Sequence, residues 1–300
     1  MAFSRNPDMK RYRFAETQMM VVRGKERRER DQDFNVEKGE CLFLPQISLL
    51  LSSRVHFRDF HKKGRGCFLT PKDRERGAIC MPAKFMTAKE AVSFIPDGCT
   101  MMVGGFGLSG QPIHLVEALL ETNTRNITVI SNNVGQQGQG IGKMLLENRV
   151  KKAIGTYFTS NPDVSRYKRE GKLEVELLPQ GTFSEAIRLG GSGIRAFYTP
   201  IAAGTLLAEK KETRVFDGKE YVLEESIRAD VALIKAHKAD RYGNLVYYKT
   251  ARNFNTVMAM AADLTIVEVD DVVEVGELDP EAIVTPHIFV NIVVKKETPL

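Results

Sequence analysis

The sequence contains no tryptophan and only four cysteines among its 300 residues. Three of the cysteines fall within the first 85 residues, at spacings that match neither a zinc site nor a disulfide framework. The histidines beyond that segment, His114, His237 and His287, also lack metal-ligand spacing, and we assign none of them a catalytic role. We therefore expect reduced thiols, a cytoplasmic location and no metal site.

Long hydrophobic runs are also missing. The longest, "CLFLPQISLLL" (41–51), is too short for a membrane span of about 20 residues and is interrupted by Pro45. It begins too far from the N-terminus to be a signal peptide. We expect no part of the chain to cross a membrane.

Net positive charge is confined to the first part of the chain. Residues 1–85 hold 19 basic and 11 acidic side chains, a net charge of +8, whereas residues 86–300 have a net charge of −3. The acidic residues within the first 33 positions argue against a mitochondrial transit peptide, and basic runs such as "RGKERRERD" are more often solvated than bound to nucleic acid. No sustained helical or strand period occurs here. We interpret 1–85 as an extension that lacks stable structure or is not part of the natural chain, and we expect no nucleic-acid partner.

From Met86 onward, strand and helix patterns alternate. Expected strands are 99–105, 127–131, 150–156 and 173–178, and expected helices are 88–94, 112–121, a segment ending at 148, 163–169 and 184–189. This alternation predicts an α/β fold, a mostly parallel sheet with helices on both faces. In the second half, Asp217-Gly218 between two alternating runs predicts a β-hairpin, and strands at 231–234, 245–248, 264–269 and 288–294 predict a mixed region. Residues 86–300 would form one domain.

A glycine loop follows the first of these strands. Gly105, Gly107 and Gly110 satisfy the dinucleotide-binding pattern G-x-G-x-x-G. Such sites also need an acidic residue at the end of the second strand, where this sequence has Asn132 and Asn133. The missing acid disfavours an NAD-binding dehydrogenase. The loop either approaches another ligand or serves only as a tight strand-to-helix turn.

A longer string around this loop is more specific. "DGCTMMVGGFGLSGQP" (97–112) resembles the first signature of the family I coenzyme A transferases. The segments 131–135, 173–193, 229–255 and 276–286 are similar to the α subunit of 3-oxoacid and acetate CoA-transferases. The resemblance covers essentially all of 86–300 and none of 1–85.

The resemblance implies a ping-pong transfer of CoA between two carboxylic acids through a glutamyl-CoA thioester. Such transferases use neither a metal nor a redox cofactor, because coenzyme A is itself a substrate. Their nucleophilic glutamate lies in a Ser-Glu-Asn-Gly-type stretch of the β subunit, but no Glu-Asn-Gly or Glu-Ser-Gly occurs in this sequence. The resemblance thus implies a β-subunit partner, in an α2β2 heterotetramer, and acyl-CoA and short-chain carboxylic acids as substrates.

The resemblance also selects candidate site residues. In its Pro-Gln-Gly motif, Gln180 would place an amide near the attacked carbonyl, where an oxyanion needs preorganised donors. The alternative is a glutamine that caps the next helix or is simply solvated. An adjoining loop of the acyl or CoA pocket would be formed by Gly104, Gly105, Phe106, Gly107 and Gly110. Phe106 is equally compatible with a core position.

Three further residues have both a functional and a purely structural interpretation. The amides of Asn132 and Asn133 would line the same cleft or belong to a plain turn. Arg252, in "ARNFN", could pair with a ligand's carboxylate or phosphate, although a structural ion pair is favoured.

The function that follows is the α subunit of a CoA-transferase that acts on acetyl-CoA or succinyl-CoA and a 3-oxo acid such as acetoacetate. The alternative is a non-catalytic CoA-binding or regulatory protein with the same fold.

Overall fold

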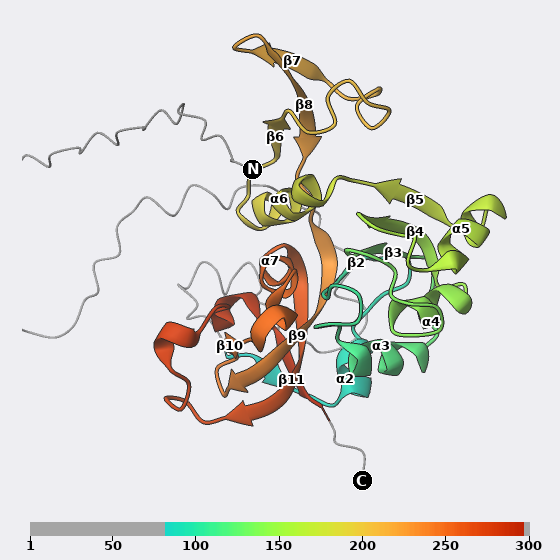
Figure 1. Ribbon diagram of the computed structural model, residues 1–300. Coiled ribbons are helices and arrows are strands. Elements are labelled where there is room, and N and C mark those ends of the chain that lie inside the picture. Colours follow the sequence, from blue (N-terminus) through green and yellow to red (C-terminus); the bar gives the residue numbers. More distant parts are fainter. Residues whose placement is uncertain (1–81, 297–300) are drawn as a thin grey trace, which may run out of the picture. The chain divides into compact units, whose positions relative to one another are not determined.

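The computed structural model describes residues 82–296, and these contain one large sheet and one small one (Figure 1). The large sheet has the strand order β1-β12-β11-β9-β2-β3-β4-β5, with β10 paired to β9. Its strands are β1 (Lys84–Phe85), β2 (Thr100–Val103), β3 (Ile127–Ile130), β4 (Val150–Gly155), β5 (Glu174–Leu177), β9 (Ala229–Asp240), β10 (Leu245–Val246), β11 (Ala262–Val273) and β12 (Ile292–Lys295). Only β10 runs antiparallel to its neighbour in this sheet.

The helices that cover the large sheet fall into two groups. They are α2 (Ala88–Val92), α3 (Ile113–Leu120), α4 (Ile141–Leu146), α5 (Pro162–Arg169), α6 (Gln180–Gly191) and α7 (Asn255–Met260). Short 3-10 turns are η3 (Lys249–Arg252), η4 (Pro280–Ala282) and η5 (His287–Phe289). Helices α2 to α5 share one hydrophobic core, whereas α6 and α7 share another.

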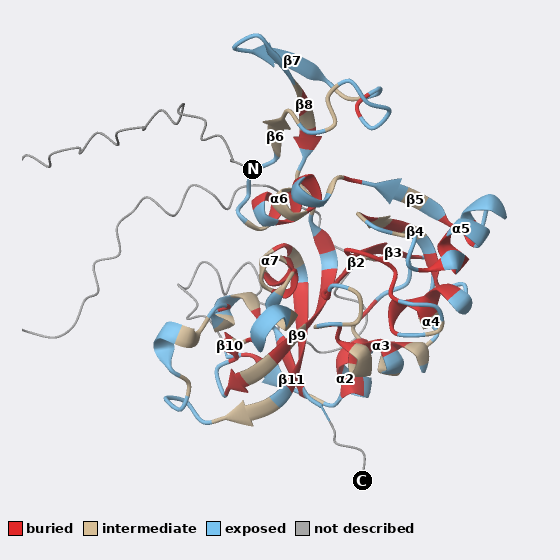
Figure 2. Cartoon of the chain, viewed as in Figure 1, coloured by how far each residue is buried: buried red, intermediate tan, exposed pale blue. Residues whose placement is uncertain are grey.

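The two cores lie on opposite faces of the large sheet because side chains alternate along each strand. Met101 and Val103 of β2 belong to the core of α2 to α5, and Met102 between them belongs to the core of α6 and α7. Figure 2 shows the central strands buried on both faces. The expected fold class, a mostly parallel sheet with helices on both faces, is therefore confirmed.

The small sheet is antiparallel and consists of β6 (Ala196–Thr199), β8 (Lys219–Glu225) and β7 (Thr213–Phe216), in that order. Strands β7 and β8 form the hairpin that the sequence predicts. Asp217 and Gly218 both have positive φ, 49° and 75°, as a two-residue hairpin turn of type I′ requires. All four residues of β7 are exposed (Figure 2).

Most expected elements occur within a few residues of their predicted ends, and the differences have local causes. Helix α6 begins at Gln180 rather than Ser184, and Pro179 is its N-cap residue. Strand β12 begins at Ile292 because residues 287–289 form a 3-10 turn. Strands β1 and β6 were not predicted, and their pairing with β12 and β8 stabilises them. Because β1 falls within 1–85, the expectation that this segment lacks stable structure is wrong for its last residues, and residues 1–81 lie outside the described part of the chain. Within the described part of the chain, no helix is both long enough and apolar enough to span a bilayer.

Candidate active site

Three neighbouring strands, β3, β4 and β5, deliver polar side chains to one edge of the large sheet. Asn132 lies two residues beyond β3, Thr156 directly follows β4, and Gln180 lies three residues beyond β5 at the start of α6. The strands are parallel and adjacent, so their carboxyl ends meet at the same edge. This is the edge at which open α/β sheets present their ligand sites.

These three residues form a hydrogen-bonded group that we call the amide cluster. The Gln180 side-chain nitrogen Nε2 donates to Asn132 Oδ1 at 2.7 Å. The Thr156 hydroxyl lies 2.8 Å from Gln180 Oε1 and 3.0 Å from Asn132 Oδ1. Each polar group of the cluster is thus oriented by another, as a preorganised site requires.

The backbone holds the amide cluster in place. The carbonyl oxygen of Asn132 accepts hydrogen bonds from the N–H groups of Thr156 and Tyr157, both at 3.1 Å. Asn132 is buried, whereas Gln180 is exposed. A glutamine amide has two N–H donors, and the contact with Asn132 uses one of them. The second has no acceptor among the described residues, so it can donate to a ligand oxygen at this edge.

Asn133 is also buried, with 6% of its surface exposed. Its side-chain oxygen Oδ1 has no hydrogen-bond partner among the described residues. An unpaired buried acceptor is costly, by about 1–3 kcal/mol. Because this oxygen is itself buried, it is not open to a ligand at the strand ends, and the role expected for Asn133 in the cleft stays a prediction.

The glycine loop after β2 is fixed by a segment distant in sequence. Asn253 accepts the Gly105 N–H at 3.1 Å and donates to the Ser109 carbonyl at 2.9 Å. A Cβ atom on Gly104 would overlap the side-chain oxygen of Asn255. Gly105 has φ of 118°, a conformation that favours glycine. Close packing and turn geometry therefore explain these two glycines in this chain.

Phe106 is the exception within that loop, because 56% of its surface is exposed. It is not a core aromatic, so that alternative is wrong. An exposed ring at the tip of a loop beside the strand ends is available to a ligand or to another chain.

The N-terminus of α3, which follows the glycine loop, is already occupied by a carboxylate. Glu268 Oε2 accepts the N–H groups of His114 and Leu115 at 2.9 and 3.2 Å. Its other oxygen is paired with Lys235 at 3.1 Å, and the Glu268 side chain is 3% exposed. In a dinucleotide-binding fold a pyrophosphate takes this position. Here the chain supplies the anion itself, which adds to the sequence argument against an NAD site.

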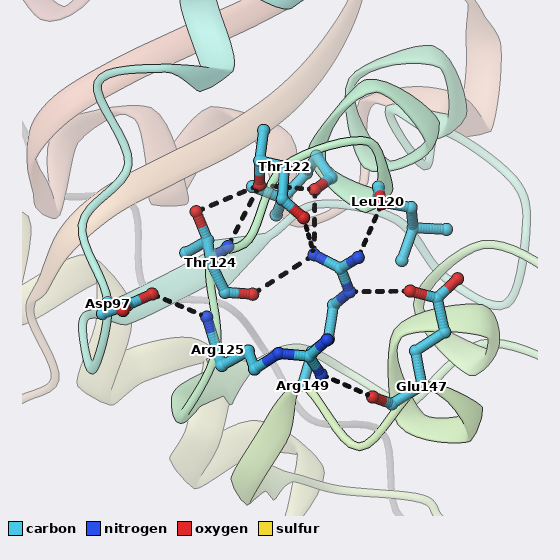
Figure 3. Close-up of polar contacts among 8 residues, drawn as sticks. Asp97, Leu120, Thr122, Thr124, Arg125, Glu147 and Arg149 are labelled. Atoms are coloured by element: carbon cyan, nitrogen blue, oxygen red, sulfur yellow. Dashed lines mark hydrogen bonds and ion pairs between the residues drawn. The ribbon is translucent and has the colours of Figure 1, made fainter.

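The opposite end of α3 is closed by Arg149, which the sequence analysis did not identify (Figure 3). Its guanidinium donates to the carbonyls of Leu119, Leu120, Thr122 and Thr124 at 2.6–3.3 Å and to the carboxylate of Glu147 at 2.8 Å. Only 4% of Arg149 is exposed. Helix α3 is thus held by an anion at its N-terminus and a cation at its C-terminus, as its dipole favours.

The structure therefore brings together Asn132 and Gln180, two of the residues expected from sequence, and adds Thr156. Thr156 could have been found from its place, because it directly follows β4, the middle one of the three parallel strands β3, β4 and β5. The glycine loop packs on residues 253–255, and Phe254 of that segment contacts Phe183 of α6 with ring centroids 5.4 Å apart. Within residues 82–296, no three His, Cys, Asp or Glu side chains are grouped to hold a metal ion.

Comparisons with known proteins identify the family of this chain. Residues 85–296 match the family model described as Coenzyme A transferase. The chain is 51% identical over 211 residues to one subunit of the 3-oxoadipate CoA-transferase of Acinetobacter baylyi, covering 69% of this chain and 92% of that protein. It is 47% identical over 219 residues to the alpha subunit of the acetate CoA-transferase of Escherichia coli K12, covering 73% of this chain and all of that protein.

A solved structure is similar as well. The acyl-CoA transferase YdiF of Escherichia coli O157:H7 has a TM-score of 0.64 and 25% identity, over 72% of this chain. This chain spans about half of that longer chain, 47% of its length. Together, the family model and the two close relatives show that the chain belongs to the coenzyme A transferase family of enzymes.

Proposed function

We propose that this chain is the α subunit of a CoA-transferase that moves CoA from acetyl-CoA or succinyl-CoA to a 3-oxo acid such as acetoacetate. The observation that carries the proposal is the amide cluster, an exposed Gln180 amide held by Asn132 and Thr156 at the carboxyl ends of parallel strands. Two relatives support the substrate class, since one is named for a 3-oxo acid and the other for acetate.

The proposed chemistry proceeds through a glutamate of the partner. Its carboxylate attacks the acyl-CoA thioester, which gives an acyl-glutamyl anhydride and releases CoA as the thiolate. The thiolate then attacks the glutamyl carbonyl, which forms a glutamyl-CoA thioester and releases the first acid. The second acid is activated by the reverse of these steps.

The role of this chain is to stabilise charge and to orient the substrate. Each attack on a carbonyl places negative charge on its oxygen, and the free N–H of Gln180 would donate to that oxygen. Asn132 and Thr156 fix the amide, so little reorganisation is needed as the charge develops. Coenzyme A acts as substrate, and the proposal includes no metal and no redox cofactor.

The partner in the proposal is a β subunit. The chain has no Glu-Asn-Gly or Glu-Ser-Gly stretch, and the two close relatives are each named as one subunit of a CoA-transferase. We infer an α2β2 heterotetramer in the cytoplasm, with half of each active site supplied by each kind of chain.

The test is coexpression of the full chain with a candidate β subunit. We expect CoA transfer from acetyl-CoA or succinyl-CoA to acetoacetate only in the copurified complex, measured by loss of the thioester. Transfer by this chain alone would contradict the proposed partner. CoA binding by calorimetry without any transfer would instead favour the alternative, a non-catalytic CoA-binding or regulatory protein with this fold.

A further inference from the structure

Two cations share one short turn next to the glycine loop. Lys249 and Arg252 are the first and last residues of η3, and both are exposed. We call this pair the cationic turn.

Arg252 is unusual among the arginines because it has no internal partner in the described part of the chain. Eight of the ten arginines in residues 82–296 donate to a carboxylate or to a backbone carbonyl. Arg252 makes no such contact within that range, and the other exception is Arg169 at the end of α5. The structural ion pair that the sequence analysis favoured for Arg252 is therefore not found among the described residues.

Lys249 is also without a carboxylate partner in the described range, and its ammonium lies 5.0 Å from the centroid of the Tyr248 ring. Its backbone has φ of 47°, in the left-handed region, which is strained for a lysine. Such strain is most often kept where it serves a site. Tyr248 itself is 54% exposed, so this ring and the two cations face solvent together.

The cationic turn is attached firmly to the glycine loop. Asn255 Nδ2 donates both to the Ala251 carbonyl within the turn and to the Gly110 carbonyl of the loop, each at 2.9 Å. Two residues beyond Arg252, Phe254 contacts Phe183 in the first turn of α6, the helix that begins with Gln180. The cationic turn is thus connected by direct contacts to both parts of the candidate site.

We propose that the cationic turn binds an anionic oxygen group of the substrate, through the guanidinium of Arg252 and the ammonium of Lys249. This proposal rests on the proposed function, because a CoA-transferase handles only anionic substrates. The group is either a phosphate of CoA or a carboxylate of the acid, and an arginine fork suits both.

The test uses the copurified complex and the substitution Arg252→Gln, with Arg169→Gln as the matched control at the other unpartnered arginine. Loss of a charge-assisted contact is expected to raise the KM of one substrate about tenfold or more with a smaller change in kcat. Arg252→Lys, which keeps the charge, is expected to recover part of this loss. The control is expected to stay within twofold of the wild type.

The substrate that shows the effect identifies the group. A raised KM for acyl-CoA that disappears with the corresponding acyl-pantetheine assigns a CoA phosphate. A raised KM for succinate but not for acetate assigns a carboxylate. Unchanged KM values for all these substrates overturn the proposal.

Failure of the proposed function is a separate result. If the wild-type complex transfers no CoA, calorimetric titration of CoA and of succinate into wild-type and Arg252→Gln complexes still decides the matter. Binding weakened about tenfold in the variant supports the cationic turn, and equal binding of both ligands overturns it.

Discussion

The surroundings of Arg149 and the amide cluster are both dense polar groups, but they differ in what they leave unsatisfied. Arg149 is buried, and all its donating nitrogens find carbonyl or carboxylate oxygens of the chain (Figure 3). The amide cluster uses one N–H of Gln180, and the second has no acceptor within residues 82–296. A polar group that is fully satisfied internally contributes to stability, whereas one with spare donors and acceptors can bind a ligand.

The location of each group in the fold explains the difference. Arg149 immediately precedes β4, and its guanidinium binds the carbonyls at the C-terminal end of α3. The amide cluster lies at the other end of the same strands, where each strand leads into a loop or a helix. The amino ends of these strands therefore serve the scaffold, and the carboxyl ends hold the candidate site.

The largest expected effect comes from removing the contacts of Arg149. Arg149→Met keeps much of the side-chain volume but removes the guanidinium donor from four buried or partly buried carbonyls, of which Leu119 retains other donors. We expect the free energy of unfolding to fall by about 3–5 kcal/mol, because several hydrogen bonds from one charged donor are lost together and buried carbonyls are left unpaired. Urea unfolding of the full chain, followed by circular dichroism, measures this change.

The control for this prediction is Arg125→Met. Arg125 lies nearby and its side chain makes one exposed contact, to the Glu147 carbonyl at 3.1 Å. Arg125→Met should lower the free energy of unfolding by less than about 1 kcal/mol. Similar losses for both variants would show that the buried contacts of Arg149 are not what holds α3.

The next effect is on catalysis rather than stability. Gln180→Ala removes the free amide donor, and we expect kcat of the copurified complex to fall about 100-fold or more, as when an oxyanion donor is lost. Because Gln180 is exposed, the unfolding midpoint should change little. Steady-state transfer assays and urea unfolding of the same samples separate the two quantities.

Thr156→Val sharpens this prediction, because it deletes a hydroxyl that orients Gln180 and leaves the amide itself. A smaller loss of kcat than in Gln180→Ala is expected, with Thr156→Ser close to the wild type. If Gln180→Ala lowered the unfolding midpoint markedly as well as kcat, the amide cluster would belong to the scaffold, as Arg149 does.

The smallest expected effect is on the reactivity of Cys99, which belongs neither to the surroundings of Arg149 nor to the amide cluster. Burial raises the pKa of its thiol to about 12, and the nearby Asp230 carboxylate acts in the same direction. A thiol with a raised pKa stays protonated at pH 8, and the thiolate is the reactive form. We expect site-resolved alkylation with iodoacetamide at pH 8 to leave Cys99 unmodified until urea is added. Rapid modification in native buffer would contradict its burial.

Much of the fold could be read from local sequence. The period-two and helical patterns predict the order of strands and helices from β2 to α6, and Asp217-Gly218 predicts the β7–β8 hairpin. These succeed because hydrogen bonding and side-chain alternation within an element depend on near neighbours. The family resemblance at 97–112 and the importance of Gln180 as a candidate were also accessible, since each depends on a short contiguous string.

The sequence by itself determined most of the elements, the family and the residue types available for chemistry. The tertiary structure decided which of them meet. It placed β9 beside β2, Glu268 on the N-terminus of α3, Asn132 against Gln180, and Asn253 on the glycine loop. These partners lie 48 to 154 residues apart, as for Gln180 with Asn132 and His114 with Glu268. No local pattern records such pairs, because their contacts arise only when packing of the whole sheet brings distant strand ends and loops together.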